Sequence, residues 1–111
     1  MDETLRARIQ TLLDAHPVVL FMKGTKSFPQ CGFSATVIEV LKRVDADFHA
    51  VNILADAELR QGMKDYANWP TFPQLYVQGR LVGGCDIVRD MYQAGELRPI
   101  VDRALGRTTE A

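Results

Sequence analysis

The sequence predicts an α/β fold, in which a four-stranded mixed sheet is flanked by helices on both faces. The fully apolar run at residues 18–22 (VVLFM) suits a strand buried on both faces. Apolar residues recur at helical spacing on either side of this run. Gln78 and Gly79 separate two short strand-like segments, which indicates a hairpin. A strand–helix–strand unit favours a parallel pair with a right-handed crossover, and the hairpin adds an antiparallel pair.

Five helices are expected from apolar positions at helical spacing. These positions are Leu5, Ile9, Leu12 and Leu13 in the first; Val37, Val40, Leu41 and Val44 in the second; Leu59, Met63 and Tyr66 in the third; Ile87, Val88, Met91 and Tyr92 in the fourth; and residues 97–105 in the fifth. Pro17 ends the first helix, and the second begins near Cys31 after a loop at residues 23–30.

Strands are expected at residues 18–22, 48–53, 74–77 and 80–82. With the helices they give the order α-β-α-β-α-β-β-α-α, which is similar to the thioredoxin-like arrangement. Periodicity alone also permits other small α/β sandwiches. We expect a single domain over residues 1–105, with a polar tail at 106–111 that is disordered.

The composition excludes several classes of protein. Thirteen basic and 14 acidic residues give a net charge of −1 and no basic stripe, so a nucleic-acid partner is not expected. The longest apolar run is far too short to cross a membrane. The start, Met1-Asp2-Glu3, lacks both the basic and the apolar region of a secretory signal. We therefore expect a location in the bacterial cytoplasm.

Cys31 is the leading candidate for chemistry. The chain has two cysteines, too few for a disulfide scaffold. A thiol at the start of a helix faces unpaired N–H groups and the positive end of the helix dipole, and Lys23 adds a positive charge. Thiolate, the nucleophile and metal ligand, is thereby favoured, so we predict a depressed pKa for Cys31. An arbitrary cysteine is more often buried and inert.

Ser34 stands three residues after Cys31, where a dithiol motif has its second cysteine. Its oxygen cannot form a disulfide, so a self-contained dithiol cycle at this motif is excluded. A plain residue of the first helical turn is an equally compatible interpretation. The missing thiol shifts the expectation for Cys31 from redox turnover toward metal ligation.

Four segments in chain order carry a specific resemblance. They are residues 22–24 (MKG), 29–34 (PQCGFS), 69–74 (WPTFPQ) and 83–86 (GGCD). Together they resemble the CGFS-type monothiol glutaredoxins of bacteria, over residues 5–105. The resemblance implies a thioredoxin-like fold, glutathione as a cofactor, and a [2Fe-2S] cluster bound through Cys31. The implied role is storage, assembly or transfer of iron–sulfur clusters.

The resemblance also implies residues that bind glutathione. Lys23 and Arg60 match positions that bind its glycyl carboxylate, for which cationic donors are suited; otherwise each would be interpreted as a surface charge. A cis bond before Pro73 would free the backbone of Phe72 to pair with glutathione as an extended peptide. A trans proline that begins an edge strand is the alternative.

The resemblance also implies that Cys85 and Asp86 bind the other end of glutathione, which carries the γ-glutamyl group. Backbone N–H groups at the start of the fourth helix suit the γ-glutamyl carboxylate, and the Asp86 carboxylate suits its amine. A plain helix cap is the alternative for Asp86. Cys85 could also resolve a disulfide with glutathione or with Cys31. Trp69 and Tyr66 are interpreted as packing residues, and His16 and His49 as residues without a metal role.

The number of ligands that a [2Fe-2S] cluster needs predicts how many chains bind it. A [2Fe-2S] cluster normally has four thiolate-type ligands, and one chain offers only Cys31. Two chains and two glutathiones complete the set, which implies a homodimer bridged by the cluster. The resemblance adds BolA-like proteins and recipient apoproteins as partners. Phe28 lies in a loop position where it could tune the lability of the cluster.

Two other functions are also compatible with the sequence. The first is a glutathione-dependent thiol oxidoreductase that removes glutathione from mixed disulfides through Cys31 alone; the resemblance implies that this activity is weak. The second is a redox-sensing adaptor in which Cys31 and Cys85 form a switch, which requires Cα atoms within about 7 Å.

Overall fold

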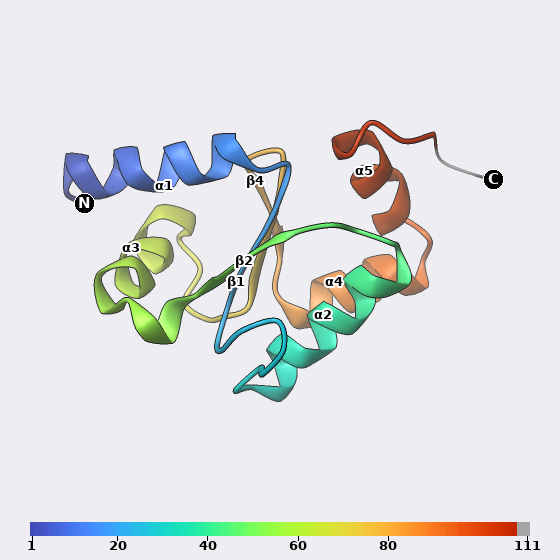
Figure 1. Ribbon diagram of the computed structural model, residues 1–111, viewed down its shortest axis with the longest axis horizontal. Helices are drawn as coiled ribbons and strands as arrows, with labels where there is room; N and C mark the ends of the chain where they lie inside the picture. Colours follow the sequence, from blue (N-terminus) through green and yellow to red (C-terminus); the bar gives the residue numbers. More distant parts are fainter. Residues whose placement is uncertain (109–111) are drawn as a thin grey trace.

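A four-stranded sheet with the strand order β2-β1-β3-β4 forms the centre of the structure (Figure 1). The computed structural model describes residues 1–108. The strands are β1 (Val18–Met22), β2 (His49–Asn52), β3 (Gln74–Val77) and β4 (Arg80–Gly83). β1 pairs in parallel with β2 and antiparallel with β3, which pairs antiparallel with β4. The predicted mixed sheet is confirmed.

In the part of the chain that the structure describes, five α-helices cover the two faces of this sheet (Figure 1). α1 (Glu3–Ala15) and α3 (Ala57–Ala67) lie on one side, and α2 (Gly32–Arg43), α4 (Cys85–Gln93) and α5 (Leu97–Ala104) lie on the other. A short 3₁₀ helix, η1 (Ile53–Ala55), joins β2 to α3. Within residues 1–108, no helix has the length and the apolar character needed to cross a membrane.

β1 supplies both halves of the core, as its apolar run predicts. Val18, Leu20 and Met22 pack on the side of α2, α4 and α5. Val19 and Phe21 pack against α1 and α3 on the opposite side. All five side chains are at most 1% exposed. Since successive side chains of a strand point to opposite faces, only a central strand covered on both sides buries every residue.

The predicted strand at residues 48–53 is longer than the strand in the structure. β2 covers His49–Asn52, and the next residue, Ile53, is buried as the first residue of η1. The side chain of Asn52 accepts a hydrogen bond from the backbone N–H of Leu54 at 3.0 Å, which ends the strand and caps the 3₁₀ turn. The hairpin turn agrees with its prediction, because Gln78 and Gly79 both have positive φ angles.

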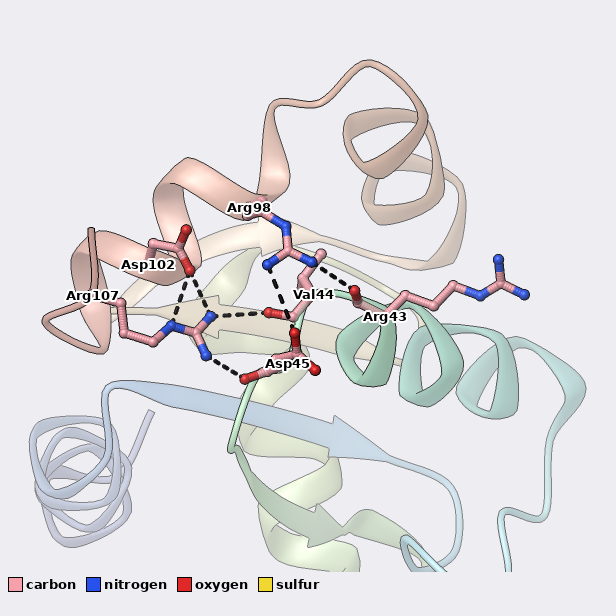
Figure 2. Close-up of polar contacts among 6 residues, drawn as sticks. All are labelled: Arg43, Val44, Asp45, Arg98, Asp102 and Arg107. Carbon is pink, nitrogen blue, oxygen red and sulfur yellow. Dashed lines mark hydrogen bonds and ion pairs between the residues drawn. The ribbon is translucent and has the colours of Figure 1, made fainter. Parts of the chain in front are cut away.

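Arg107, in the tail predicted to be disordered, is hydrogen-bonded to residues of the domain. The Arg107 guanidinium donates to one carboxylate oxygen of Asp102 from Nε at 3.0 Å and from Nη2 at 2.6 Å (Figure 2). It also donates to the carbonyl oxygens of Val44 and Asp45 at 3.0 and 2.5 Å. The Asp102 side chain is 4% exposed, and a buried carboxylate needs such a partner. Arg107 therefore contacts the domain from beyond the predicted boundary, which stays a prediction, while residues 109–111 of that tail lie outside the described residues.

Candidate functional site

A cavity of about 390 Å³ lies where three distant segments meet. They are the end of β1 with the start of α2, the loop before β3, and the start of α4. The residues that line the cavity are Lys23, Cys31, Phe33, Trp69, Thr71, Phe72, Pro73, Gly84, Cys85, Asp86 and Ile87. Five of the six site residues expected from the sequence are therefore together, and Arg60 is not among them. The binding roles of all six remain predictions.

Cys31 is the N-cap residue of α2 and is partly exposed. Burial alone would raise the pKa of its thiol. The backbone N–H groups of Ser34 and Phe33 oppose this effect, together with the charge of Lys23 and the hydroxyl of Ser34. Their sum holds the pKa of Cys31 below its ordinary value, in the direction predicted for a thiol at a helix N-terminus.

Ser34 is fully buried in the first turn of α2. Its Oγ accepts a hydrogen bond from the backbone N–H of Lys23 at 3.2 Å. The Ser34 hydroxyl also contributes to lowering the pKa of the Cys31 thiol, after the backbone N–H groups of Ser34 and Phe33 and the charge of Lys23. Ser34 is thus more than a residue of the first turn, because its side chain binds the backbone at the end of β1 and favours the Cys31 thiolate.

The loop after β1 is held by backbone contacts. The carbonyl oxygen of Lys23 accepts the Gln30 N–H at 2.9 Å, and Gly24 donates its N–H to Oδ1 of Asn52 at 2.9 Å. Gly24 has a φ of +98°, and a Cβ atom there would lie 2.5 Å from the carbonyl oxygen of Phe28. Only glycine fits this position. The backbone of Lys23 is therefore fixed while its side chain lines the cavity.

Phe28 lies in the same loop and is 74% exposed. Thr25 and Phe28 exchange two backbone hydrogen bonds of 3.2 Å, and the Thr25 hydroxyl accepts the Phe28 N–H at 3.1 Å. Phe33, in the first turn of α2, is 63% exposed, and Ile87 in α4 is 39% exposed. Phe33 and Ile87 line the cavity, so apolar side chains surround its mouth.

The loop before β3 contains a cis peptide bond between Phe72 and Pro73, as the resemblance implies. The fully buried Gln74 supports this loop, because its Nε2 donates to the carbonyl oxygens of Trp69 and Thr71, both at 3.2 Å. Its Oε1 accepts the hydroxyl of Tyr76 at 3.0 Å. Gln74 belongs to the sequence segment 69–74 (WPTFPQ), but the sequence alone does not predict that its side chain supports this loop.

Trp69 lines the cavity, although the sequence interpretation treated it as a packing residue. Its Nε1 is buried and has no hydrogen-bond partner among the described residues. A Cβ atom on Gly84 would lie 3.5 Å from this nitrogen and 3.3 Å from the carbonyl oxygen of Pro73. The start of α4 therefore approaches the cis-proline loop closely.

At the start of α4, Gly84 is the N-cap residue and Asp86 lies in the first turn. The helix-cap alternative for Asp86 is therefore wrong. Its carboxylate is exposed and accepts a hydrogen bond from Arg89 at 3.1 Å. Cys85 is buried, and burial raises the pKa of its thiol above the ordinary value. Unlike Cys31, Cys85 is thus held as a neutral thiol.

Arg60 lies in α3 outside the cavity lining, and its Nε is buried without a hydrogen-bond partner among the described residues. His16 and His49, to which the sequence interpretation gave no metal role, stack face to face with ring centroids 4.0 Å apart. Among residues 1–108, no group of three or more His, Cys, Asp or Glu side chains could hold a metal ion.

The fold and the site define a class of protein: a thioredoxin-like domain with one activated cysteine at a helix N-terminus and a serine in place of its resolving partner. The chain belongs to the glutaredoxin family, and its relatives are monothiol glutaredoxins. Residues 18–82 match the sequence profile of that family, described as Glutaredoxin.

Two curated relatives and one solved structure illustrate the match. The chloroplastic monothiol glutaredoxin-S7 of rice, Oryza sativa subsp. japonica, is 52% identical over 101 residues, which are 91% of this chain and 60% of the rice protein. A monothiol glutaredoxin of Synechocystis, described as uncharacterized and ycf64-like, is 50% identical over 95% of this chain and 98% of its own length. The chain thus spans less than two thirds of the rice relative and nearly all of the bacterial one.

The solution structure of reduced poplar apo GrxS14 superposes with a TM-score of 0.82 at 53% sequence identity. The match covers 92% of this chain and 94% of that chain. It confirms the thioredoxin-like glutaredoxin fold.

Proposed function

We propose that this protein binds glutathione in the Cys31 cavity and uses the Cys31 thiolate together with glutathione to carry a [2Fe-2S] cluster. The observation that supports the proposal most is the single activated thiol at the edge of a cavity of about 390 Å³. This volume is within the range of small-ligand sites. Membership of the monothiol glutaredoxins supports the same choice of ligand.

The chemistry of the cavity suits a small acidic peptide. Lys23 offers a cation for one carboxylate, and the backbone N–H groups at the start of α4, which lines the same cavity, offer a second anion site. Phe72 and Pro73 also line the cavity, and the backbone of Phe72 would pair there with an extended chain. Asp86 would receive the amine of glutathione, and Arg60 is proposed as a second cation for its glycyl carboxylate.

The donors in one chain fit a cluster that two chains share, and not a cluster that a single chain binds. Iron–sulfur clusters are held by thiolates, and Cys31 is the one cysteine whose environment favours thiolate. A hard oxygen ligand such as Ser34 is a poor substitute. With one protein ligand per chain, four ligands require two chains and two glutathione thiols. The proposed holo form is therefore a homodimer in which the cluster is cargo exposed between the subunits.

The apolar rim of the cavity supports the proposed contact between subunits. Phe33 and Ile87 line the cavity and expose aromatic and aliphatic surface, and Phe28 is exposed in the loop before Cys31. Such surface is typical of a transient protein contact. The same rim would meet a BolA-like protein in a mixed complex, or the recipient apoprotein. A reducing compartment, for which we propose the bacterial cytoplasm, would keep Cys31 available.

Anaerobic reconstitution tests this function. The protein is mixed with iron, sulfide and glutathione, and its visible absorption is recorded. We expect a charge-transfer band that requires glutathione and that Cys31→Ser abolishes. Cys85→Ser is expected to retain the band, because a buried neutral thiol is not a ligand. A colourless protein under all conditions would refute the cluster-carrier proposal.

The partial exposure and lowered pKa of Cys31 also favour a second candidate function, thiol oxidoreduction. The Cys31 thiolate would attack the glutathione sulfur of a mixed disulfide, forming a Cys31–glutathione disulfide and releasing the substrate thiolate. A second glutathione thiolate would then release oxidised glutathione and restore Cys31. Fast turnover on a small glutathione mixed disulfide would establish this function, and its absence would exclude it.

A further inference from the structure

Asn52 lies at a junction between the loop after β1 and the segment that leads into α3. Its Oδ1 accepts two backbone hydrogen bonds, from Gly24 at 2.9 Å and from Leu54 at 3.0 Å. An amide oxygen has two lone pairs, and both are used here. One side-chain atom therefore joins two segments about 30 residues apart in sequence.

The first segment carries Lys23. The N–H of Lys23 is held by the Ser34 hydroxyl, its carbonyl oxygen by the Gln30 N–H, and the next N–H along the chain, that of Gly24, by Asn52. The backbone on both sides of Lys23 is thus fixed, and Asn52 holds the end nearer the loop. The Lys23 ammonium has no hydrogen bond or ion pair with another described residue, so the backbone determines where its side chain enters the cavity.

The second segment leads to Arg60. Leu54 belongs to η1, and Asp56 after it caps α3 by accepting the Leu59 N–H at 3.0 Å. The N–H of Arg60 donates to the carbonyl oxygen of Asp56 at 2.9 Å. Hydrogen bonds thus hold the backbone at Leu54 and again at Asp56, on the short path from Asn52 to the residue that the proposed function pairs with Lys23 on the same carboxylate.

We propose that Asn52 is a positioning residue for glutathione, whose Oδ1 holds the Lys23 and Arg60 segments at the spacing that the glycyl carboxylate requires. This inference rests on the proposed binding of glutathione in the Cys31 cavity. Asn52 does not contact the ligand, because it does not line the cavity. It acts through the two backbone segments that its side chain joins.

Three variants test this role. Asn52→Ala removes the acceptor. Asn52→Asp keeps acceptor oxygens for both N–H groups, and comparison at high salt screens its added charge. Asp2→Ala is the matched control, because it removes a cap of the same kind from α1, where Asp2 accepts the Thr4 N–H at 2.6 Å. This cap belongs to a helix that does not line the cavity.

Two readouts accompany each variant: glutathione affinity, from the fluorescence of Trp69 in the cavity, and hydrogen exchange of the Gly24 amide. Asn52→Ala removes both hydrogen bonds, and because they act on glutathione only through the backbone, we expect affinity roughly three- to tenfold weaker, with selectively faster exchange at Gly24. Asn52→Asp should restore both readouts, and Asp2→Ala should change neither.

Unchanged affinity in Asn52→Ala, with the Gly24 amide exposed to exchange, would overturn this inference alone. Failure of Asn52→Asp to recover affinity at high salt would do the same. Absence of glutathione binding in the wild-type protein would overturn the proposed function and this inference with it.

Discussion

The hydroxyl oxygen of Ser34 accepts the backbone N–H of Lys23 at 3.2 Å, which joins the first turn of α2 to the end of β1. Lys23 lowers the pKa of Cys31 by its charge, and Ser34 lowers it through its N–H and its hydroxyl. The residue that replaces a resolving cysteine thus both holds the Lys23 backbone and favours the Cys31 thiolate. A serine at this position removes disulfide chemistry and at the same time favours the thiolate.

Ser34→Ala is expected to raise the pKa of Cys31 and to lower the fraction of thiolate at neutral pH, because the hydroxyl donor is lost. The Lys23 N–H also loses its partner, so stability should fall by about 1 kcal/mol. The pH dependence of Cys31 alkylation measures the first effect, and urea unfolding measures the second. Ser27→Ala, at an exposed position of the preceding loop, is the control. An alkylation profile identical to wild type would show that the hydroxyl does not reach the thiol.

Lys23→Gln is expected to weaken glutathione binding roughly tenfold, as for loss of a charge-assisted hydrogen bond worth about 1.5 kcal/mol. The change should also raise the pKa of Cys31, since the charge of Lys23 lowers it. The chain has a single tryptophan, Trp69, and it lines the cavity, so its fluorescence reports binding directly. Lys42→Gln, at an exposed position near the end of α2, controls for net charge. Equal weakening in both variants would contradict a specific role for Lys23.

Arg107→Gln is expected to destabilise the fold by about 2–3 kcal/mol, because it leaves the buried Asp102 carboxylate without its cation. The estimate is below the value for a fully buried pair, since the Arg107 side chain is 34% exposed. Urea unfolding measures the loss. Arg103→Gln removes an exposed arginine of α5, next to Asp102 in the sequence, and should cost little. If both variants unfold at the same urea concentration, the contacts of Figure 2 do not stabilise the domain.

Asp56→Asn is expected to reduce the pH dependence of stability in acid. The Leu59 N–H, and then Arg8, hold the pKa of the Asp56 carboxyl below its ordinary value of 3.8. A group with a lowered folded-state pKa stabilises the fold fully above the unfolded value, and this contribution is lost as the pH falls through the folded pKa. Asparagine keeps the cap oxygen without titrating. Thermal unfolding as a function of pH should therefore show a shallower acid limb in the variant, and parallel limbs would exclude this role.

Local sequence patterns predicted the parts of the fold that depend on neighbouring residues. The apolar run of β1, the helical spacing of Leu5 and Ile9, and the hairpin turn at Gln78 each depend on a few adjacent positions. Cys31 was predicted as an activated thiol for the same reason, because a helix N-terminus is a local feature.

Contacts between distant segments could not be predicted in this way. Asn52 looks like a strand residue, and its role depends on Gly24, which reaches it only after β1 and β2 pair. Arg107 looks like part of a polar tail, but its acceptors Val44 and Asp45 are more than 60 residues earlier. In both cases a side chain binds backbone atoms of another segment, and such a bond leaves no periodic pattern in the sequence.

In the proposed holo protein, Cys31 and glutathione from two chains share one cluster. The composition of the holo protein is therefore the most direct test of this proposal. Native mass spectrometry of the anaerobically reconstituted protein measures that composition. We expect a species of two chains, two glutathiones and one [2Fe-2S] cluster, which is absent for Cys31→Ser. A cluster held by one chain, or by two chains without glutathione, would contradict it.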